Sequence, residues 1–397
     1  MSTGVNIVGA YNSKFGKLEE DNLYTLYEKA AKGALDNAGV SAAEIDGVFV
    51  GNYSGGSFNN QENIAPFGVN VIPELRHKPM YRTETACTSG SSAIHMAIMA
   101  IKSGMMKRVL VVGLEKMTEV DTKGATHSLA LAGYWPEEGA QHVTAPCMFS
   151  ELGLGWMREY GYSEQELRQW LAQISAKAYT NAADNPIAHL QKPRSAEDIL
   201  SLPDEKNPMI NKPLRLHDCS LISDGSAGLV LESAELSSNN SSVEISCFYN
   251  ASDFLDNFGK HKADHFLEGA AVAVKHVLDQ VGLTIADVQL AEVHDCFTIT
   301  ELLIYSAMGL TEPGKEFEAL ENGTVHAGGK CVINASGGLK AKGHPIGATG
   351  VSMHAHIYKQ LIGDAYGLQV TDAEIGMTVN MGGAGTSNSV SVLKRQS

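Results

Sequence analysis

The chain has 397 residues, 44% of them hydrophobic and 19% charged, an ordinary composition for a globular protein with two or three domain-sized cores. Its net charge of −15 at neutral pH argues against a nucleic-acid-binding protein, which would carry a basic face. The six cysteines are scattered without a CxxC pair, so their spacing predicts neither a zinc site nor a dense set of disulfides.

Strand and helix patterns alternate through the first part of the chain. An apolar run at residues 5–10 predicts a buried strand, and the segment 23–39 predicts the helix after it. Further strands are expected at residues 45–53 and 107–115, on either side of a helix that begins near Cys87. This alternation predicts an α/β fold with a central sheet.

Residues 120–214 have a different character, with little β patterning and helical stretches such as residues 163–185. We expect an inserted region here that covers a site as a lid. The strand pattern returns at residues 224–233.

The second half of the chain repeats the order of the first. The matching segments are residues 288–297, 347–363, 375–383 and 386–395. They correspond, in order, to the second strand, the helix near Cys87, the third strand and the strand that follows the insertion. Two copies of one βαβ-rich unit would place the starts of the two matching helices near one another.

This duplication predicts three parts. They are a first half of residues 1–119 plus 215–235, an inserted region of residues 120–214, and a second half of residues 236–397.

Cys87 stands at a helix start among small residues, in the sequence ACTSG. One interpretation is a packing residue, because free cysteine is among the most buried residue types. The other is a nucleophile, because a helix N-terminus favours the thiolate. A histidine in a Gly/Pro turn, His344, holds the equivalent place in the second half and would be able to take the thiol proton.

The HDCF motif ends a buried-type strand, and active-site residues collect at such carboxyl ends. On a strand His294 and Cys296 would face one way and Asp295 the other, so the first two suggest an acid/base pair. A similar motif, HDCS at residues 217–220, lacks a Gly-rich turn and is interpreted as structural. His95 and His354 are interpreted as packing or surface residues.

The motifs ACTSG, HDCF and GGLKAKGHPIGATG, in this order, resemble the thiolase superfamily, and particularly the thiolases related to sterol carrier protein X. The resemblance covers nearly the whole chain. It implies the thiolase fold, in which duplicated halves form a layered α-β-α-β-α core with an inserted loop domain in the first half. It also implies an acyl-CoA C-acyltransferase, which makes or cleaves the carbon–carbon bond of 3-ketoacyl-CoA by way of an acyl-cysteine.

The same resemblance implies a role for each motif residue. Cys87 matches the acylated nucleophile, and His344 matches the histidine that activates this thiol. His294 matches a residue of the first oxyanion hole. The backbone N–H groups of Cys87 and Gly382 match the second oxyanion hole, which would hold the acyl oxygen.

One position departs from the commoner thiolases. They have a Cys-x-Gly motif whose cysteine acts as acid and base, and here that position is Asn380. In the sterol-carrier-like branch the cysteine of HDCF takes this role, and Cys296 is present. The resemblance therefore implies a complete site.

Three alternatives are less favoured. A retro-aldol lyase of steroid side chains is one, but such relatives lack the nucleophilic thiol. A non-catalytic lipid-binding or scaffold subunit would not need the intact motif residues. Decarboxylating condensing enzymes lack the second thiol, so Cys296 argues against that class.

The expected substrates are coenzyme A and acyl-CoA, with no permanently bound cofactor and no metal. CoA carries phosphates, and the inserted region holds basic residues, of which Lys177, Lys212 and Arg215 are the first candidates. The other candidates in this region are Lys192, Arg194 and Lys206. A solvated surface balanced by nearby acidic residues is the alternative for each of them.

Location and assembly are also expectations. The N-terminus lacks a signal-peptide pattern, the longest apolar stretches are far shorter than the ~20 residues that span a bilayer, and the C-terminus is not Ser-Lys-Leu. We expect a cytoplasmic protein without nucleic-acid or membrane partners. The resemblance implies a homodimer or a dimer of dimers.

Overall fold

The computed structural model describes residues 2–236, 242–255 and 266–396. The strands are β1 (Val5–Asn12), β2 (Gly47–Gly51), β3 (Met80–Thr83), β4 (Arg108–Glu115), β5 (Met209–Asn211), β6 (Leu214–Arg215), β7 (Gly225–Ser233), β8 (Val243–Ser252), β9 (Leu290–Val293), β10 (Val332–Ile333), β11 (Ile375–Gly382) and β12 (Ser387–Arg395). The helices are α1 (Leu23–Ala38), α2 (Gly55–Asn59), α3 (Phe67–Val71), α4 (Ser89–Lys102), α5 (Thr122–Ala130), α6 (Ala145–Tyr160), α7 (Glu164–Ala182), α8 (Ala196–Ser201), α9 (Glu268–Val281), α10 (Thr298–Ala307), α11 (Glu318–Glu321) and α12 (Ile346–Leu361), with a π-helical turn η7 (Gly338–Lys342) before the last.

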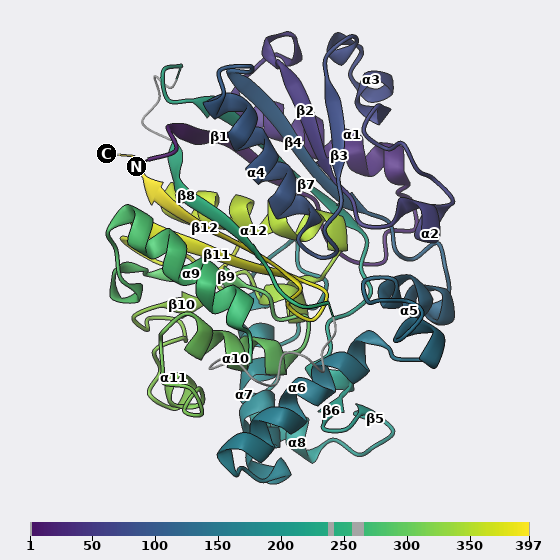
Figure 1. The fold of residues 1–397 in the computed structure, drawn as a ribbon, viewed down its shortest axis with the longest axis vertical. Helices are drawn as coiled ribbons and strands as arrows, with labels where there is room; N and C mark the ends of the chain where they lie inside the picture. Colours follow the sequence, from purple (N-terminus) through teal and green to yellow (C-terminus); the bar gives the residue numbers. More distant parts are fainter. Residues whose placement is uncertain (1, 237–241, 256–265, 397) are drawn as a thin grey trace.

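Ten strands form one sheet in the order β10-β9-β11-β12-β8-β1-β7-β4-β2-β3, and β5 pairs with β6 separately. Each half of this sheet has the same order, with β8 to β12 standing where β1, β2, β3, β4 and β7 stand in the first half. The halves meet through a short antiparallel pairing of β1 with β8. The predicted duplication is therefore present in the strand order (Figure 1).

Three hydrophobic clusters define the layers. One packs α1 against the outer face of β2 and β4, and another packs α9 and α10 against the outer face of the second half. The third lies between the two halves and holds side chains of α4 and α12 together with inward residues of both. The expected α-β-α-β-α order is confirmed.

The two central helices touch at their starts. A Cβ added to Gly90 in α4 would lie 2.8 Å from the carbonyl oxygen of Gly347 in α12, so only glycine permits this approach. The turns that precede these helices are consequently brought together in the middle of the molecule.

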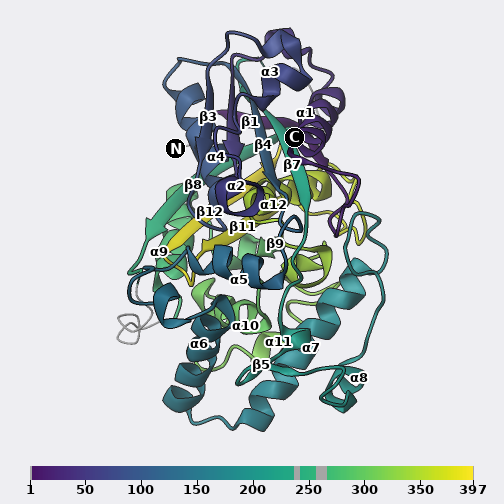
Figure 2. The same ribbon diagram turned by 90° about the vertical axis from the view of Figure 1, so that its right-hand side faces the viewer.

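Residues 120–214 carry α5 to α8 and the β5–β6 pair, and they contribute no strand to the large sheet. In Figure 1 most of this region forms the lower end of the molecule, and Figure 2 shows α5 between α2 and α6. The domain boundaries stay a prediction; the one at residue 236 adjoins residues outside the described part. No helix of the described residues is long and apolar enough to cross a membrane.

Candidate active site

Cys87 lies in the turn that leads into α4, one residue before the N-cap Thr88. The preceding Ala86 has a φ of +52°, the left-handed region that costs a non-glycine residue about 1–2 kcal/mol. Ser89 braces this turn, because its Oγ–H donates to Ala86 O at 2.6 Å and its Oγ accepts from Thr85 N–H at 3.0 Å. The strained turn holds the thiol at the positive end of α4.

Two histidines from the second half meet this thiol. Sγ of Cys87 and one ring nitrogen each of His294 and His344 lie within 4.8 Å of one another. His294 follows β9, and His344 stands between η7 and α12. The two rings are nearly perpendicular, with centroids 5.2 Å apart. The structure thus brings together three of the four side chains that the sequence singled out.

His344 has its tautomer set by Thr349. The Thr349 hydroxyl donates to Pro345 O at 2.9 Å, so it accepts from His344 Nδ1–H at 2.7 Å. The other ring nitrogen, Nε2, is then an unprotonated acceptor. Burial, and next the charge of Lys342, lower the pKa of His344 to about 3, so the ring is neutral at pH 7. This arrangement is that of a general base.

His294 has the opposite tautomer. Ser91 Oγ–H donates to Asn380 Oδ1 at 2.9 Å, which turns the amide nitrogen of Asn380 toward His294 Nδ1 at 3.1 Å. Because Nδ1 accepts this bond, the proton of the neutral ring is on Nε2. Burial lowers the pKa of His294 well below its ordinary value. Nε2 is buried without a hydrogen-bond partner among the described residues, so it can donate to a substrate oxygen.

Burial raises the pKa of Cys87 to about 12, while the backbone N–H of Gly383 on the sulfur opposes this shift. The resting pair is therefore a thiol beside a neutral imidazole. Gly382 packs against Thr85, where an added Cβ would lie 2.4 Å from the carbonyl oxygen.

Cys296 lines a cavity of about 390 Å³ together with Cys87 and His344. β9 ends before the HDCF motif, which forms the turn between β9 and α10. The expected alternation still holds, because Asp295 points elsewhere and accepts from Leu339 N–H at 2.6 Å. Burial raises the pKa of Cys296 well above its ordinary value, and the neighbouring Cys87 adds to this shift. Cys296 therefore rests as a thiol.

The rest of the cavity wall is largely apolar. Much of it comes from residues 120–214, including Leu129, Met148, Phe149 and Ile210. No aspartate, glutamate, lysine or arginine is among the residues that line it. The cavity is suited to an apolar chain that ends at the three thiol and imidazole groups.

Sequence reasoning missed Glu115, which joins the halves beside this site. Its buried carboxylate accepts from the N–H groups of Tyr53 at 2.8 Å, Ser54 at 3.2 Å and Gly347 at 2.9 Å. Burial raises its pKa to about 7, and these hydrogen bonds act in the opposite direction. The available signal was a charged residue at the carboxyl end of a buried strand.

The HDCS motif needs a partial correction. Asp218 is structural as expected, since it is buried and ion-paired with Arg168. Cys219, however, lines the cavity that Cys87 and Cys296 also line, because the two HDC motifs run side by side and Ser220 N–H donates to Cys296 O at 2.8 Å. Sequence alone did not show that these segments are neighbours.

The three basic residues first considered for CoA each have a carboxylate partner. The pairs are Lys177–Glu301, Lys212–Glu164 and Arg215–Asp204, with N–O distances of 2.8, 2.9 and 2.7 Å. Lys177 is also buried, so its ammonium has no surface to offer a ligand. The other two are at the surface.

Replacing Asn380 with alanine should lower kcat by about tenfold, a fraction of the ~10²–10³-fold that loss of an oxyanion donor costs. The reason is that His294 loses the bond that keeps its proton on Nε2. Nitrogen-15 NMR of the His294 ring should show a mixture of tautomers. Ser91→Ala interrupts the same series of hydrogen bonds and should also lower kcat. Wild-type kcat and an unchanged tautomer in both variants would contradict this assignment.

Comparisons with known proteins agree with these motifs. The family model for the thiolase N-terminal domain matches residues 5–194, and the thiolase C-terminal domain-like model matches residues 257–395. The chain is 35% identical over 398 residues to an acetyl-CoA acetyltransferase of Methanothermobacter thermautotrophicus, covering 98% of this chain and 99% of that protein. It is 30% identical over 398 residues to sterol carrier protein 2 of Oryctolagus cuniculus, covering 95% of this chain and 70% of that protein. A solved Ltp2-ChsH2(DUF35) aldolase has the same fold, with a TM-score of 0.83 at 19% identity over 99% of this chain and 98% of that chain.

Proposed function

This chain belongs to the thiolase family and is an acyl-CoA C-acyltransferase of that type. We propose that Cys87 is its acylated residue and that His344, His294 and Cys296 assist the reaction at Cys87. The observation that carries this proposal is the meeting of Cys87, His294 and His344 within 4.8 Å, next to an apolar cavity that Cys296 also lines. The proposed substrates are 3-ketoacyl-CoA and CoA in one direction and two acyl-CoA molecules in the other.

In the cleavage direction, Cys87 Sγ attacks the keto carbon while its proton passes to His344 Nε2. The carbon–carbon bond then breaks, the acyl group stays on Cys87, and an acetyl-CoA enolate departs. Cys296 gives its thiol proton to the enolate carbon, and the high pKa of Cys296 keeps that proton in place until this step. His294 Nε2–H stabilises the enolate oxygen.

Free CoA completes the cycle. Its thiol attacks the acyl carbon on Cys87 and gives its proton to the Cys296 thiolate, and Cys87 leaves with the proton held by His344. Backbone N–H groups of the glycine turn after β11 stabilise the acyl oxygen during both attacks. Gly382 is the residue that the resemblance implies, and support for Gly383 comes from its N–H on the Cys87 sulfur.

The test uses a series of 3-ketoacyl-CoAs of increasing chain length. We expect cleavage that depends on free CoA, and intact-protein mass spectrometry should show one acyl group per chain. The apolar wall favours unbranched hydrocarbon chains over charged ones. Absence of both the adduct and CoA-dependent cleavage across the series would refute the proposal.

The likeness to an aldolase suggests a second candidate, which is carbon–carbon cleavage without an acyl-enzyme. That reaction needs neither a nucleophilic thiol nor free CoA, and so it would not use the pairing of Cys87 with His344. The two candidates are distinguished by omitting CoA from the cleavage assay. Only the aldolase reaction would continue at an unchanged rate.

Cys296→Ala should still accept an acyl group on Cys87 from acyl-CoA, while cleavage of 3-ketoacyl-CoA falls by about 10²-fold. The reason is that the enolate has lost its proton donor, whereas attack by Cys87 uses a different base. Burst kinetics of adduct formation and steady-state cleavage measure the two steps separately. Cys219→Ala is the matched control, a second thiol of the same cavity for which no proton transfer is proposed. Equal losses of acylation and cleavage in Cys296→Ala would contradict this division of roles.

We also propose that the enzyme is a homodimer, works in the cytoplasm and holds no permanent cofactor. Support for the dimer comes from the edge strand β3, where Tyr81 is 54% exposed, and from the exposed Met96 and Met99 on α4. Support for the cytoplasm comes from the six cysteines, all of them free. Light scattering at micromolar concentration tests the first statement.

A further inference from the structure

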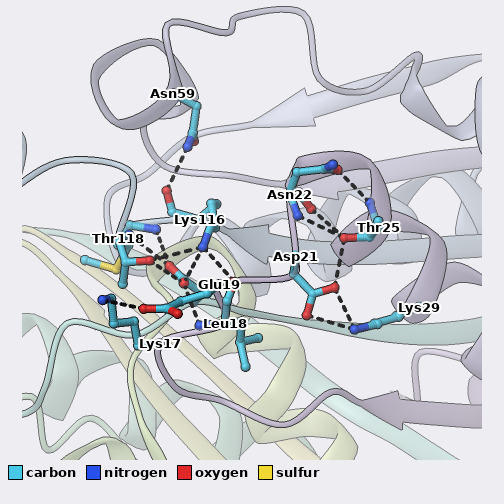
Figure 3. A network of polar contacts seen from close by, with 12 residues as sticks. Lys17, Leu18, Glu19, Asp21, Asn22, Thr25, Lys29, Asn59, Lys116 and Thr118 are labelled. Carbon is cyan, nitrogen blue, oxygen red and sulfur yellow. Dashed lines mark hydrogen bonds and ion pairs between the residues drawn. The ribbon is translucent and has the colours of Figure 1, made fainter.

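Five lysines of the described residues are buried, and four of them contact a carboxylate. These pairs are Lys116–Asp224, Lys177–Glu301, Lys342–Glu292 and Lys359–Asp364, with N–O distances of 2.8, 2.8, 3.8 and 2.6 Å. Figure 3 shows the first of these ammonium groups, on Lys116, which also donates to Leu18 O at 2.8 Å and Thr118 Oγ1 at 3.1 Å. This chain therefore normally provides an anionic partner for an interior ammonium group.

Lys340 is the exception. It is 2% exposed, and among the described residues no carboxylate lies within ion-pair distance of its Nζ. Its Nζ donates to the Tyr179 hydroxyl at 2.9 Å and lies 4.6 Å from the centre of that ring. A buried charge without a counter-charge is costly, and neither a phenol oxygen nor a ring face replaces a carboxylate. The interior around Lys340 consequently lacks one negative charge.

Lys340 lines a second cavity, of about 500 Å³, and other basic side chains line it as well. Lys192 and Arg194 also line it, and neither makes an ion pair with another described residue. No aspartate or glutamate is among the lining residues. The cavity thus has three cationic side chains and no carboxylate, so its local charge is positive although the net charge of the protein is −15.

Two histidines also line this cavity, and only one of them offers a donor to a ligand. The Tyr179 hydroxyl accepts from Lys340 Nζ and donates to His217 Nδ1 at 2.7 Å, so the proton of the neutral His217 ring is on Nε2. The Ser223 hydroxyl donates to Leu221 O, so it accepts from His189 Nδ1–H at 3.0 Å and leaves His189 Nε2 as an acceptor. Burial, followed by the charges of Lys340 and Arg194, lowers the pKa of His217 to about 4. The potential inside the cavity is therefore positive without a contribution from histidine charge.

The two cavities adjoin each other. Leu216 and Leu221 line both the catalytic cavity and the cationic one, so a single segment of chain forms the wall between them. A molecule with an apolar thioester end and an anionic end would find a matching environment on each side of this wall.

We propose that the cationic cavity binds a phosphate or diphosphate group through Lys340, Arg194 and Lys192. Two sources have this chemistry. One is the phosphate end of the CoA substrate, and this source rests on the proposed function. The other is a separate phosphate-bearing ligand that occupies the cavity independently of the thioester.

The test compares Lys340→Met and the rim variant Arg194→Gln with wild type, with Lys206→Met as the control. Lys206 is an exposed lysine of the same region that does not line the cavity. Titration calorimetry with inorganic pyrophosphate should show binding to wild type and to the control, weakened about tenfold or more in the two variants, since each variant removes a charged hydrogen-bond donor. If Lys340→Met does not fold, Arg194→Gln still gives the answer from a surface position.

Acylation of Cys87 by acetyl-CoA and by S-acetylpantetheine, which lacks the phosphates, identifies the source. A rise of about tenfold in the KM for acetyl-CoA alone assigns the cavity to the substrate, and pyrophosphate should then compete with acetyl-CoA. Unchanged KM values with weakened pyrophosphate binding assign it to a separate ligand. Equal pyrophosphate binding and equal KM values in all proteins would overturn the site. Absence of acylation by either thioester would instead refute the proposed function, and the pyrophosphate titration would still decide the site.

Discussion

Cys87→Ala should abolish the acyl adduct and reduce CoA-dependent cleavage by a factor on the order of 10⁵–10⁶, as expected when a covalent nucleophile is removed. The loss is large because the two thiols of the proposed mechanism are not interchangeable. Cys296 lies after β9 and does not stand in the strained turn at the start of α4. It therefore lacks the backbone N–H groups that stabilise an acyl oxygen on Cys87.

Intact-protein mass spectrometry after mixing with acetyl-CoA measures the adduct, and peptide mapping locates it. Cys147→Ala is the matched control, since this thiol lies at the start of α6 near the cavity but does not line it. The control should form the adduct at the wild-type rate. An adduct of unchanged yield in Cys87→Ala, or one mapped to Cys219 or Cys296, would show that the nucleophile is misassigned.

His344→Ala should slow acylation at pH 7 by about 10²–10⁴-fold, the usual contribution of a general base. In wild type neither reacting group should give the rate a pH dependence across the neutral range, because burial lowers the pKa of His344 to about 3 and raises that of Cys87 to about 12. The neighbouring Glu115, whose pKa burial raises to about 7, titrates there in wild type and in the variant alike.

The variant should have a different pH profile. Without the imidazole, attack requires the Cys87 thiolate, whose fraction grows about tenfold per pH unit below the thiol pKa of about 12. The acylation rate should therefore rise with pH and recover part of the loss. Stopped-flow measurement of adduct formation from pH 6 to about pH 10 checks this slope.

His95→Gln and His354→Gln are the controls. Both histidines are buried and share the hydroxyl of Ser391, with ring nitrogens 3.2 and 3.0 Å from it, well away from the thiol. They are packing residues, and their replacement should leave the pH profile as it is in wild type. The same rise of the rate with pH in all three variants would mean that general destabilisation had been mistaken for chemistry.

The secondary structure was predictable where the pattern is local. Apolar runs and helix caps indicated β1, β4, α1 and α4, and the matching segments of the second half indicated β9, β11, β12 and α12. β3 and β8 were not predicted. β3 is a short edge strand whose side chains are partly exposed, and β8 is paired with β1 and β12, which lie far from it in the sequence. Strand pairing of this kind is decided by partners that a local pattern does not contain.

The candidate catalytic residues were also predictable, because motif order and spacing single out Cys87, His294, Cys296 and His344, and their roles stay a prediction. The same motifs do not reveal how each group is tuned. Asn380 looked like a lost cysteine, yet in the structure it orients His294, and Cys219 looked structural although it lines the cavity. The basic residues of the insertion were indistinguishable until their partners were visible.

By itself, the sequence determined the family and the duplicated architecture and predicted the four candidate reactive side chains, because these depend on residue type, order and local periodicity. Only the tertiary structure decided which proton each histidine carries, that both thiols rest protonated, and which lysine lacks a counter-charge. The physical reason is that hydrogen-bond partners, burial and charge compensation are properties of neighbours in space. Ser91 and Asn380, or Lys340 and Tyr179, become neighbours only when segments more than a hundred residues apart are packed together.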